Sequence, residues 1–220
     1  MAFKAWNKTD LIRIDSVEEK KEFYKKNAEK YNRSDVPRKA PLEFLTGDQF
    51  KESIDKYMQR ALQKGVPPLF KGIKYLYKDQ NKLKIVEQLV LEYADNLAKE
   101  GYFNLGSKGA ETEPPTTLLW VYYFLAQHFD YLSETDKALS YINKAIDHTP
   151  TLVELYMVKG KIYKHAGNYL EAVRWLDEAQ SLDTADRFIN YKCSKYMLRA
   201  SMIKEAQDIA SKFTRVCFFF

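Results

Sequence analysis

The carboxyl-terminal half of the chain repeats a pattern of side chains at a spacing of 34 residues. Small and bulky residues keep the same order in three consecutive units, and one position is alanine every time. The aligned positions are Tyr122, Tyr156 and Asn190; Leu125, Lys159 and Cys193; Ala126, Gly160 and Ser194; Phe129, Tyr163 and Met197; Ala138, Ala172 and Ala206; and Ala145, Ala179 and Phe213. A repeat of this length restricts the chain to an architecture of similar units stacked in a row.

A period of about 34 residues is typical of tetratricopeptide repeats, in which each unit is a hairpin of two helices. Small residues recur where the two helices would cross, because a small side chain lets the helices pack closely. Such units cannot bury their apolar faces alone, so they stack into a solenoid whose concave and edge surfaces bind other proteins. The sequence therefore predicts an all-α fold, a tetratricopeptide-repeat α-solenoid of stacked helical hairpins.

The amino-terminal half predicts helices without a regular repeat. Apolar residues at helical spacing indicate helices over residues 16–31, from 46 to a stop at 65–68, around 69–77 and over 82–99. Ser16 with Glu19, and Thr46 with Gln49, have the spacing of a capping box. Residues 101–115 hold three glycines and two prolines, which a helix interior would not tolerate. We therefore expect a less regular helical segment over 1–115, three repeats over 116–215 and an apolar tail over 216–220.

Composition limits the classes of protein to which the chain can belong. The 45% of hydrophobic residues predicts folded cores, and no run approaches the roughly 20 apolar residues that cross a bilayer. No secretion signal opens the chain, so we expect a cytoplasmic protein, with the nucleus as a second location. The net charge of +5 is mixed along the chain and does not predict binding to nucleic acid. Two cysteines are too few for a disulfide framework, and we expect Cys193 to pack inside a helix.

The sequence gives little support to an enzyme. His128, His148 and His165 lack the spacing of metal ligands, and we expect His165 to be a polar residue of a turn between helices. Gly106 and Gly109 do not follow a strand, as a phosphate-binding loop would require. No catalytic, cofactor-binding or metal-binding residue is predicted.

The last two repeats carry a group of basic residues with two interpretations. Its members are Lys161, Lys164, Arg174, Arg187, Lys192, Lys195 and Arg199. Carboxylates interrupt the group, which favours an ordinary solvated helical face. The alternative is a binding surface for a polyanion or an acidic partner, because Lys192, Lys195 and Arg199 stand three and four residues apart and share one face of a helix.

Several longer segments are more specific than the repeat period. They are residues 36–45, 64–68, 114–120, 125–130, 163–168 and 177–190, in that order. Together they closely resemble the auxiliary subunit of the N-terminal acetyltransferase A complex, over roughly residues 16 to 215. The family protein is much longer, and neither the opening Met-Ala-Phe nor the final Val-Cys-Phe-Phe-Phe resembles it. A truncated product or an alternative transcript end is our preferred explanation of the tail at 216–220, with an anchor or docking tail as the rival.

The resemblance implies a non-catalytic scaffold. Auxiliary subunits of this family wrap the small catalytic acetyltransferase subunit, direct it toward Ser, Ala, Thr, Gly, Val and Cys N-termini, and anchor the complex to the ribosome. Acetyl-CoA would belong to the partner, so no cofactor is expected on this chain. Family members can also hold inositol hexakisphosphate between the two subunits, and its expected contacts here are Lys164, Arg187, Lys192, Lys195 and Tyr196. The alternative function is a general tetratricopeptide interaction module that binds acidic partners.

Overall fold

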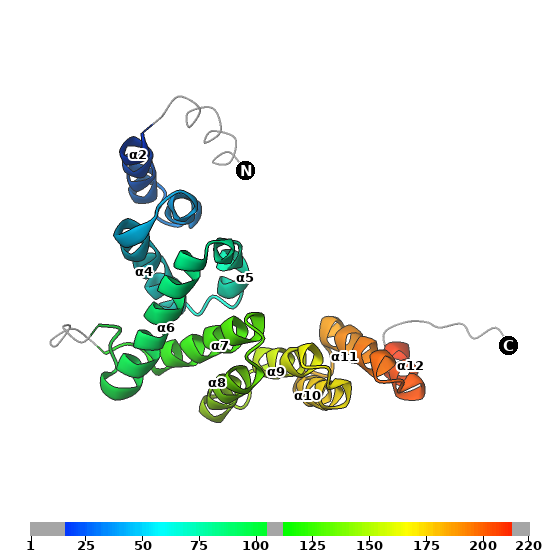
Figure 1. Ribbon diagram of the computed structural model, residues 1–220. Helices are drawn as coiled ribbons and strands as arrows, with labels where there is room; N and C mark the ends of the chain where they lie inside the picture. Colours follow the sequence, from blue (N-terminus) through cyan, green and yellow to red (C-terminus); the bar gives the residue numbers. More distant parts are fainter. Residues whose placement is uncertain (1–15, 105–111, 213–220) are drawn as a thin grey trace. The chain divides into compact units, whose positions relative to one another are not determined.

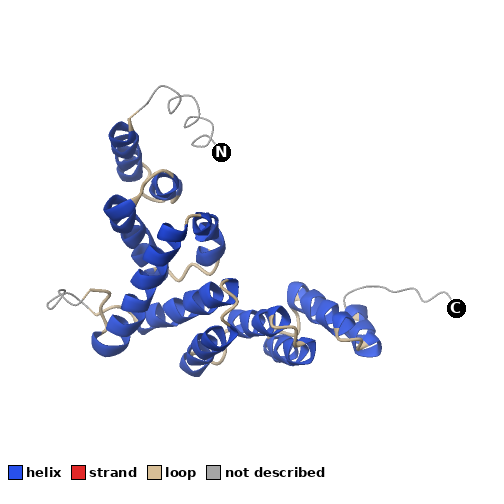
Figure 2. Ribbon diagram, in the orientation of Figure 1, coloured by secondary structure: helices blue, strands red, loops and turns tan. Residues whose placement is uncertain are grey.

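The computed structural model describes residues 16–104 and 112–212. In these residues every regular element is a helix (Figure 2), so the all-α prediction is confirmed. The chain divides into two compact units, Met1–Glu113 and Pro114–Phe220, at the end of the glycine- and proline-rich segment. Within the described ranges, no helix has the length and apolar character that crossing a membrane requires. Phe213 and the tail at 216–220 lie outside the described residues.

The first unit packs its helices around the apolar faces of two long ones. Its elements are α2 (Val17–Lys30), α3 (Val36–Lys39), the 3-10 helix η1 (Ala40–Glu43), α4 (Gly47–Gln63), α5 (Leu69–Ile73), the 3-10 helix η2 (Lys74–Lys78) and α6 (Gln80–Glu100) (Figure 1). Phe50 and Ile54 of α4 and Val86 and Val90 of α6 are fully buried. α4 packs on α6, and α2 packs on α3 and η1.

The ends of these helices test the capping predictions. The Ser16 hydroxyl accepts a hydrogen bond of 3.1 Å from the backbone N–H of Glu19, as predicted. The prediction for Thr46 was wrong, because its side chain makes no capping hydrogen bond. The helix there begins instead at Gly47, with a φ of 56° that glycine adopts without steric cost. Asp79, which the sequence analysis missed, caps α6 through its carboxylate.

Two short helices between α2 and α4 were not predicted. The segment that contains Pro37 and Pro41 had no predicted helix, yet it forms α3 and η1, each with its proline in the first turn. Proline is tolerated there because the first backbone N–H groups of a helix have no intrahelical acceptor. Both prolines are buried, so they contribute to packing as well.

The described part of the second unit consists of three helical hairpins. They are α7 (Pro115–Tyr131) with α8 (Thr135–His148), α9 (Val153–His165) with α10 (Tyr169–Leu182), and α11 (Arg187–Arg199) with α12 (Ile203–Ser211). Each helix contacts the next along the chain, so successive hairpins stack (Figure 1). The recurring alanines Ala138, Ala172 and Ala206 are buried, and so is Cys193.

Two details explain why the hairpins repeat so closely. A Cβ atom added to Gly160 would lie 3.0 Å from the backbone oxygen of Ala172, which confirms that a small residue is needed where α9 crosses α10. The turns also repeat, because Ser133, Gly167 and Ser201 stand 34 residues apart and all have positive φ, at 63°, 82° and 61°. In each hairpin, a residue with left-handed backbone conformation therefore occupies the same position in the turn between the two helices.

Candidate binding surface on the helical repeats

Basic side chains of α9 and α11 lie near enough for the charges on α11 to act on Lys164 of α9. Burial lowers the pKa of the Lys164 ammonium, and the positive charges of Arg199, Lys161 and Lys192 lower the pKa further. The Asp130 carboxylate has the opposite effect on the pKa of Lys164. We call Lys161, Lys164, Lys192 and Arg199 the basic cluster. A bound anion would relieve the repulsion among its four cations.

Aromatic rings on α11 lie under the cations of the same helix. The Lys192 ammonium is 5.1 Å from the centre of the Phe188 ring, and the Lys195 ammonium is 5.8 Å from that of Tyr191. The two rings are exposed, at 56% and 59% respectively. Cation–π contact of this kind steadies a charged side chain at the surface without neutralising its charge.

The five residues expected to bind the anion lie on two helices, Lys164 on α9 and the other four on α11. Lys164 and Lys192 belong to the basic cluster, and the buried Tyr196 lies close enough for the charge of Arg199 to act on its hydroxyl. Arg187 is the first residue of α11, and Lys195 lies beside Tyr191. These two residues add positive charge at other points of the same helix.

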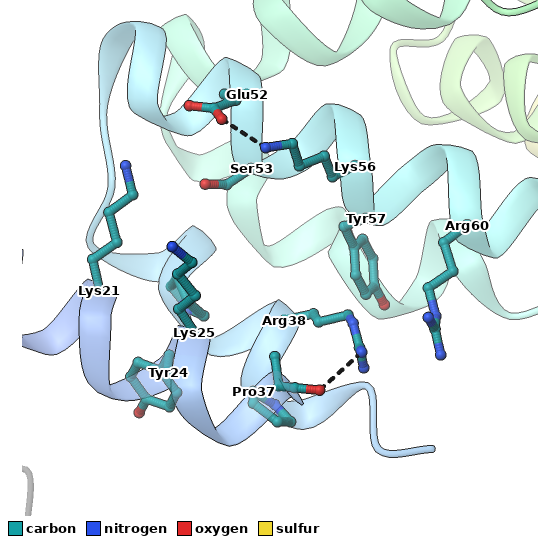
Figure 3. Close-up of a pocket in the computed structure, with 12 residues that line it drawn as sticks. Lys21, Tyr24, Lys25, Pro37, Arg38, Glu52, Ser53, Lys56, Tyr57 and Arg60 are labelled. Carbon is teal, nitrogen blue, oxygen red and sulfur yellow. Dashed lines mark hydrogen bonds and ion pairs between the residues drawn. The ribbon is translucent and has the colours of Figure 1, made fainter. Parts of the chain in front are cut away.

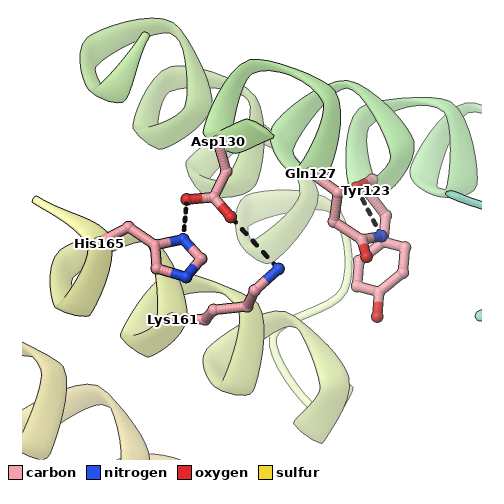
Figure 4. A network of polar contacts seen from close by, with 5 residues as sticks. All are labelled: Tyr123, Gln127, Asp130, Lys161 and His165. Carbon is pink, nitrogen blue, oxygen red and sulfur yellow. Dashed lines mark hydrogen bonds and ion pairs between the residues drawn. The ribbon is translucent and has the colours of Figure 1, made fainter. Parts of the chain in front are cut away.

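A polar network joins the first two hairpins beside this cluster (Figure 4). The Asp130 side chain on α7 is only 4% exposed, and its two oxygens contact Lys161 Nζ at 3.3 Å and His165 Nδ1 at 2.7 Å. Because a carboxylate only accepts hydrogen bonds, Nδ1 of His165 carries the proton. The prediction that His165 lies in a turn was wrong, since it is the last residue of α9 and pairs with Asp130. The spacing of four between Lys161 and His165 was the available signal.

Lys159 was also missed as a buried cation. The repeat aligns it with Leu125 and Cys193, and the structure buries all three. Its ammonium lies 3.3 Å from the centre of the Trp175 ring, and burial lowers its pKa. The aliphatic stem of the lysine therefore fills an apolar position while the aromatic face receives the charge.

The side chains of this surface are suited to binding an anionic ligand. It offers cations, aromatic rings and a buried carboxylate that fixes α9 against α7. Among the described residues, no group of three or more His, Cys, Asp or Glu side chains is placed to hold a metal ion. Fold and surface together define a helical-repeat protein of the tetratricopeptide class, with a basic face on its second and third hairpins.

Comparison with known proteins gives the family. The model of the family described as N-terminal acetyltransferase A, auxiliary subunit, matches residues 3–217. The chain belongs to this family, and the resemblance found in its sequence segments is confirmed.

Its relatives are considerably longer than this chain. "N-alpha-acetyltransferase 16, NatA auxiliary subunit" from Mus musculus is 52% identical over 204 residues, which cover 93% of this chain and 24% of the relative. "N-terminal acetyltransferase A complex auxiliary subunit NAA15" from Arabidopsis thaliana is 43% identical, over 91% of this chain and 22% of the relative. The chain thus spans about a quarter of the length of these relatives.

A solved structure of the family has the same fold. In "Structure of Naa15/Naa10 bound to HypK-THB", one chain superposes with a TM-score of 0.79 at 35% sequence identity. The match covers 91% of this chain and 29% of the other. The arrangement of helices in this chain is therefore shared with the matching part of that relative.

Proposed function

We propose that this chain acts as part of a non-catalytic scaffold, which binds the catalytic subunit of an N-terminal acetyltransferase through residues 116–213. The observation that carries the proposal is the similarity to the Naa15/Naa10 structure, together with membership of the auxiliary-subunit family. The stacked hairpins supply a preformed surface, so binding would not have to order the partner-facing helices. Acetyl-CoA would be held by the partner.

Two further roles of the scaffold belong to the same proposal. The chain would help to direct the catalytic subunit toward small N-terminal residues such as serine, and would help to dock the complex at the ribosome, in the cytoplasm. Both roles require a rigid support that holds the catalytic subunit in one orientation. The packing of each helix of the second unit on the next supplies such rigidity.

The basic residues of α9 and α11 would hold inositol hexakisphosphate at the contact between the two subunits. Lys164, Arg187, Lys192, Lys195 and Tyr196 are the proposed ligands. Support comes from Lys164, whose pKa is lowered by burial and then by the charges of Arg199 and Lys192, and a polyanion would offset the effect of these charges. A ligand with many phosphates could also reach Arg187 and Lys195 at other points of α11.

Co-expression with a catalytic subunit tests the scaffold. We expect the two chains to elute together in size-exclusion chromatography, and the complex to acetylate a Ser-starting peptide faster, relative to a Glu-starting peptide, than the catalytic subunit alone does. Separate elution with unchanged peptide preference would contradict the proposal. Capture of acidic proteins in place of the catalytic subunit would support the general interaction module instead.

A further inference from the structure

A groove in the first unit has no role in the function proposed above. It lies between α2, α4 and the α3–η1 segment and encloses about 610 Å³ (Figure 3). Lys21, Tyr24, Lys25 and Ala28 line it from α2, one helical turn after another. The facing wall, from α4, is lined by Glu52, Ser53, Lys56, Tyr57 and Arg60. Eight residues of helix extend about 12 Å, so the groove is long enough for about four residues of extended peptide.

The walls of the groove carry far more positive than negative charge. Five cationic side chains line it, and the single carboxylate among them, Glu52, contacts Lys56 at 2.7 Å. The cations are Lys21, Lys25, Arg38, Lys56 and Arg60. Burial lowers the pKa of Arg38, and the charge of Arg60 lowers it further, while Asp35 acts in the opposite direction. The groove therefore has unneutralised positive charge.

The two arginines are held by neutral groups. Arg38 donates to the backbone oxygens of Ala28, Asn32 and Ser34, at 3.0, 3.2 and 2.7 Å. Arg60 Nη2 donates to the backbone oxygen of Asn32 at 2.7 Å. The buried Nε of Arg60 has no hydrogen-bond partner. Carbonyl oxygens fix the guanidinium groups in place without cancelling their charge. Lys21 and Lys25 stand on the opposite wall.

The floor of the groove is apolar. Tyr24, Ala28, Pro37, Pro41 and Tyr57 contribute to it. Tyr24 is only 5% exposed, and its ring packs against that of Phe44, with centroids 6.1 Å apart. A ring buried in this way cannot serve as the open platform on which a nucleic-acid base stacks. The less buried Ala28 and Tyr57 offer carbon surface to an apolar side chain. Inorganic phosphates would leave the apolar floor unused.

We propose that this groove binds a short acidic peptide segment in which an apolar side chain is flanked by aspartates or glutamates. Lys21 and Lys25, like Lys56 and Arg60, stand four residues apart, which is about 6 Å along a helix. Alternate side chains of an extended peptide are spaced by about 7 Å, so its carboxylates can meet successive cations on the walls. The apolar side chain lies on the floor between them. The site is independent of the second unit, and so of the proposed contact with the catalytic subunit.

Fluorescence anisotropy with a labelled Asp-Glu-Phe-Glu-Asp peptide tests this site on the full chain. Lys25→Glu with Lys56→Glu should weaken binding about tenfold or more, because two attractive contacts become repulsive. The matched control is Lys26→Glu with Lys51→Glu, which makes the same change in net charge on the same two helices, at exposed residues that do not line the groove. The control pair should stay within about threefold of the original chain, since these exposed side chains do not line the groove and salt screens their charges. Circular dichroism checks that both variants keep their helices.

Three results would overturn the proposal. Equal loss of affinity in the two variants would mean that the peptide responds only to net charge. Unchanged binding after serine replaces phenylalanine in the peptide would remove the role of the apolar floor. Tighter binding of tripolyphosphate or single-stranded RNA than of the peptide, with the same dependence on Lys25 and Lys56, would assign the groove to another ligand.

Discussion

The Asp130 carboxylate on α7 and the His165 imidazole on α9 meet at 2.7 Å, and this contact joins one helical repeat to the next. The carboxylate is buried, while His165 and the second partner, Lys161, are each 41% exposed. The pair therefore acts at the border between the interior and the basic cluster. It holds the end of α9, where Lys164 lies, against the first hairpin.

Asp130→Asn should destabilise the second unit. The amide keeps the shape of the side chain but loses the charge that attracts Lys161 and His165, and its NH₂ group is forced toward one of these donors. We expect a loss of about 1–3 kcal/mol in the free energy of unfolding, because buried polar groups lose their partners. Urea denaturation measures it.

The control for this variant is Asp136→Asn on α8. Asp136 is exposed, so the same chemical change should alter the free energy of unfolding by less than about 0.5 kcal/mol. If both variants unfold at the same urea concentration, the Asp130 network contributes nothing to stability.

Gly160→Ala tests the crossing of α9 and α10. Alanine normally stabilises a helix relative to glycine, but here its Cβ would meet the Ala172 oxygen at 3.0 Å and the Leu176 side chain at 3.1 Å. We expect a net loss of about 1–3 kcal/mol from overpacking, measured as a lower midpoint of thermal unfolding. Gly72→Ala on α5 is the matched control, because the nearest atom there is Lys39 Nζ at 3.8 Å. A rise in stability at both positions would refute the close crossing.

Stability should fall at alkaline pH, and Tyr123 is one cause. Burial, with a smaller effect from the charge of Glu154, raises the pKa of the Tyr123 hydroxyl to about 12. The unfolded chain ionises this hydroxyl near its ordinary pKa of 10.0, whereas the folded chain keeps it protonated. Its contribution is therefore fully present below pH 10 and is lost as the pH rises toward 12.

Tyr123→Phe should reduce this dependence on pH. Between about pH 10 and 12, the variant should lose roughly 1 kcal/mol less stability per pH unit than the original chain. Urea denaturation at pH 8 and pH 11 gives the comparison. Tyr191→Phe, which removes the hydroxyl of an exposed tyrosine, is the control. Parallel slopes for all three chains would show that Tyr123 ionises freely in the folded state.

The fold could be predicted wherever a residue type suits only one structural position. Ala138, Ala172 and Ala206 mark helix crossings because only small side chains fit there. The unpredicted helices α3 and η1 each have a proline at their second residue, and a proline is as common in a turn as in the first turn of a helix. Burial of Pro37 and Pro41 against other helices decides between a turn and a helix. The spacing of residues in the sequence does not predict that burial.

The candidate sites depended on contacts between repeats, which a single period does not reveal. Asp130 and His165 stand 35 residues apart, so they occupy neighbouring positions of two repeats and meet only after the hairpins stack. Lys159 stands at a repeat position that is otherwise apolar, and the sequence does not reveal that the Trp175 ring lies against its ammonium group. Lys192 and Arg199, in contrast, were linked by helical spacing alone. Lys164, which the resemblance had already implied, lies on another hairpin, where burial and then the charges of Arg199 and Lys192 lower its pKa.

Charge reversal on α11 tests whether the basic residues bind a polyanion. Lys192→Glu with Lys195→Glu should weaken binding of inositol hexakisphosphate by about tenfold or more, because two attractive contacts with phosphate become repulsive. Both side chains reach solvent, so the unfolding midpoint should change little. Isothermal titration calorimetry, on the chain alone and with the catalytic subunit, measures the affinity. Lys204→Glu with Lys212→Glu is the control of equal charge, at exposed positions on and just after α12. If the affinity falls equally in both pairs, or in neither, Lys192 and Lys195 belong to an ordinary solvated helical face and do not bind the polyanion specifically.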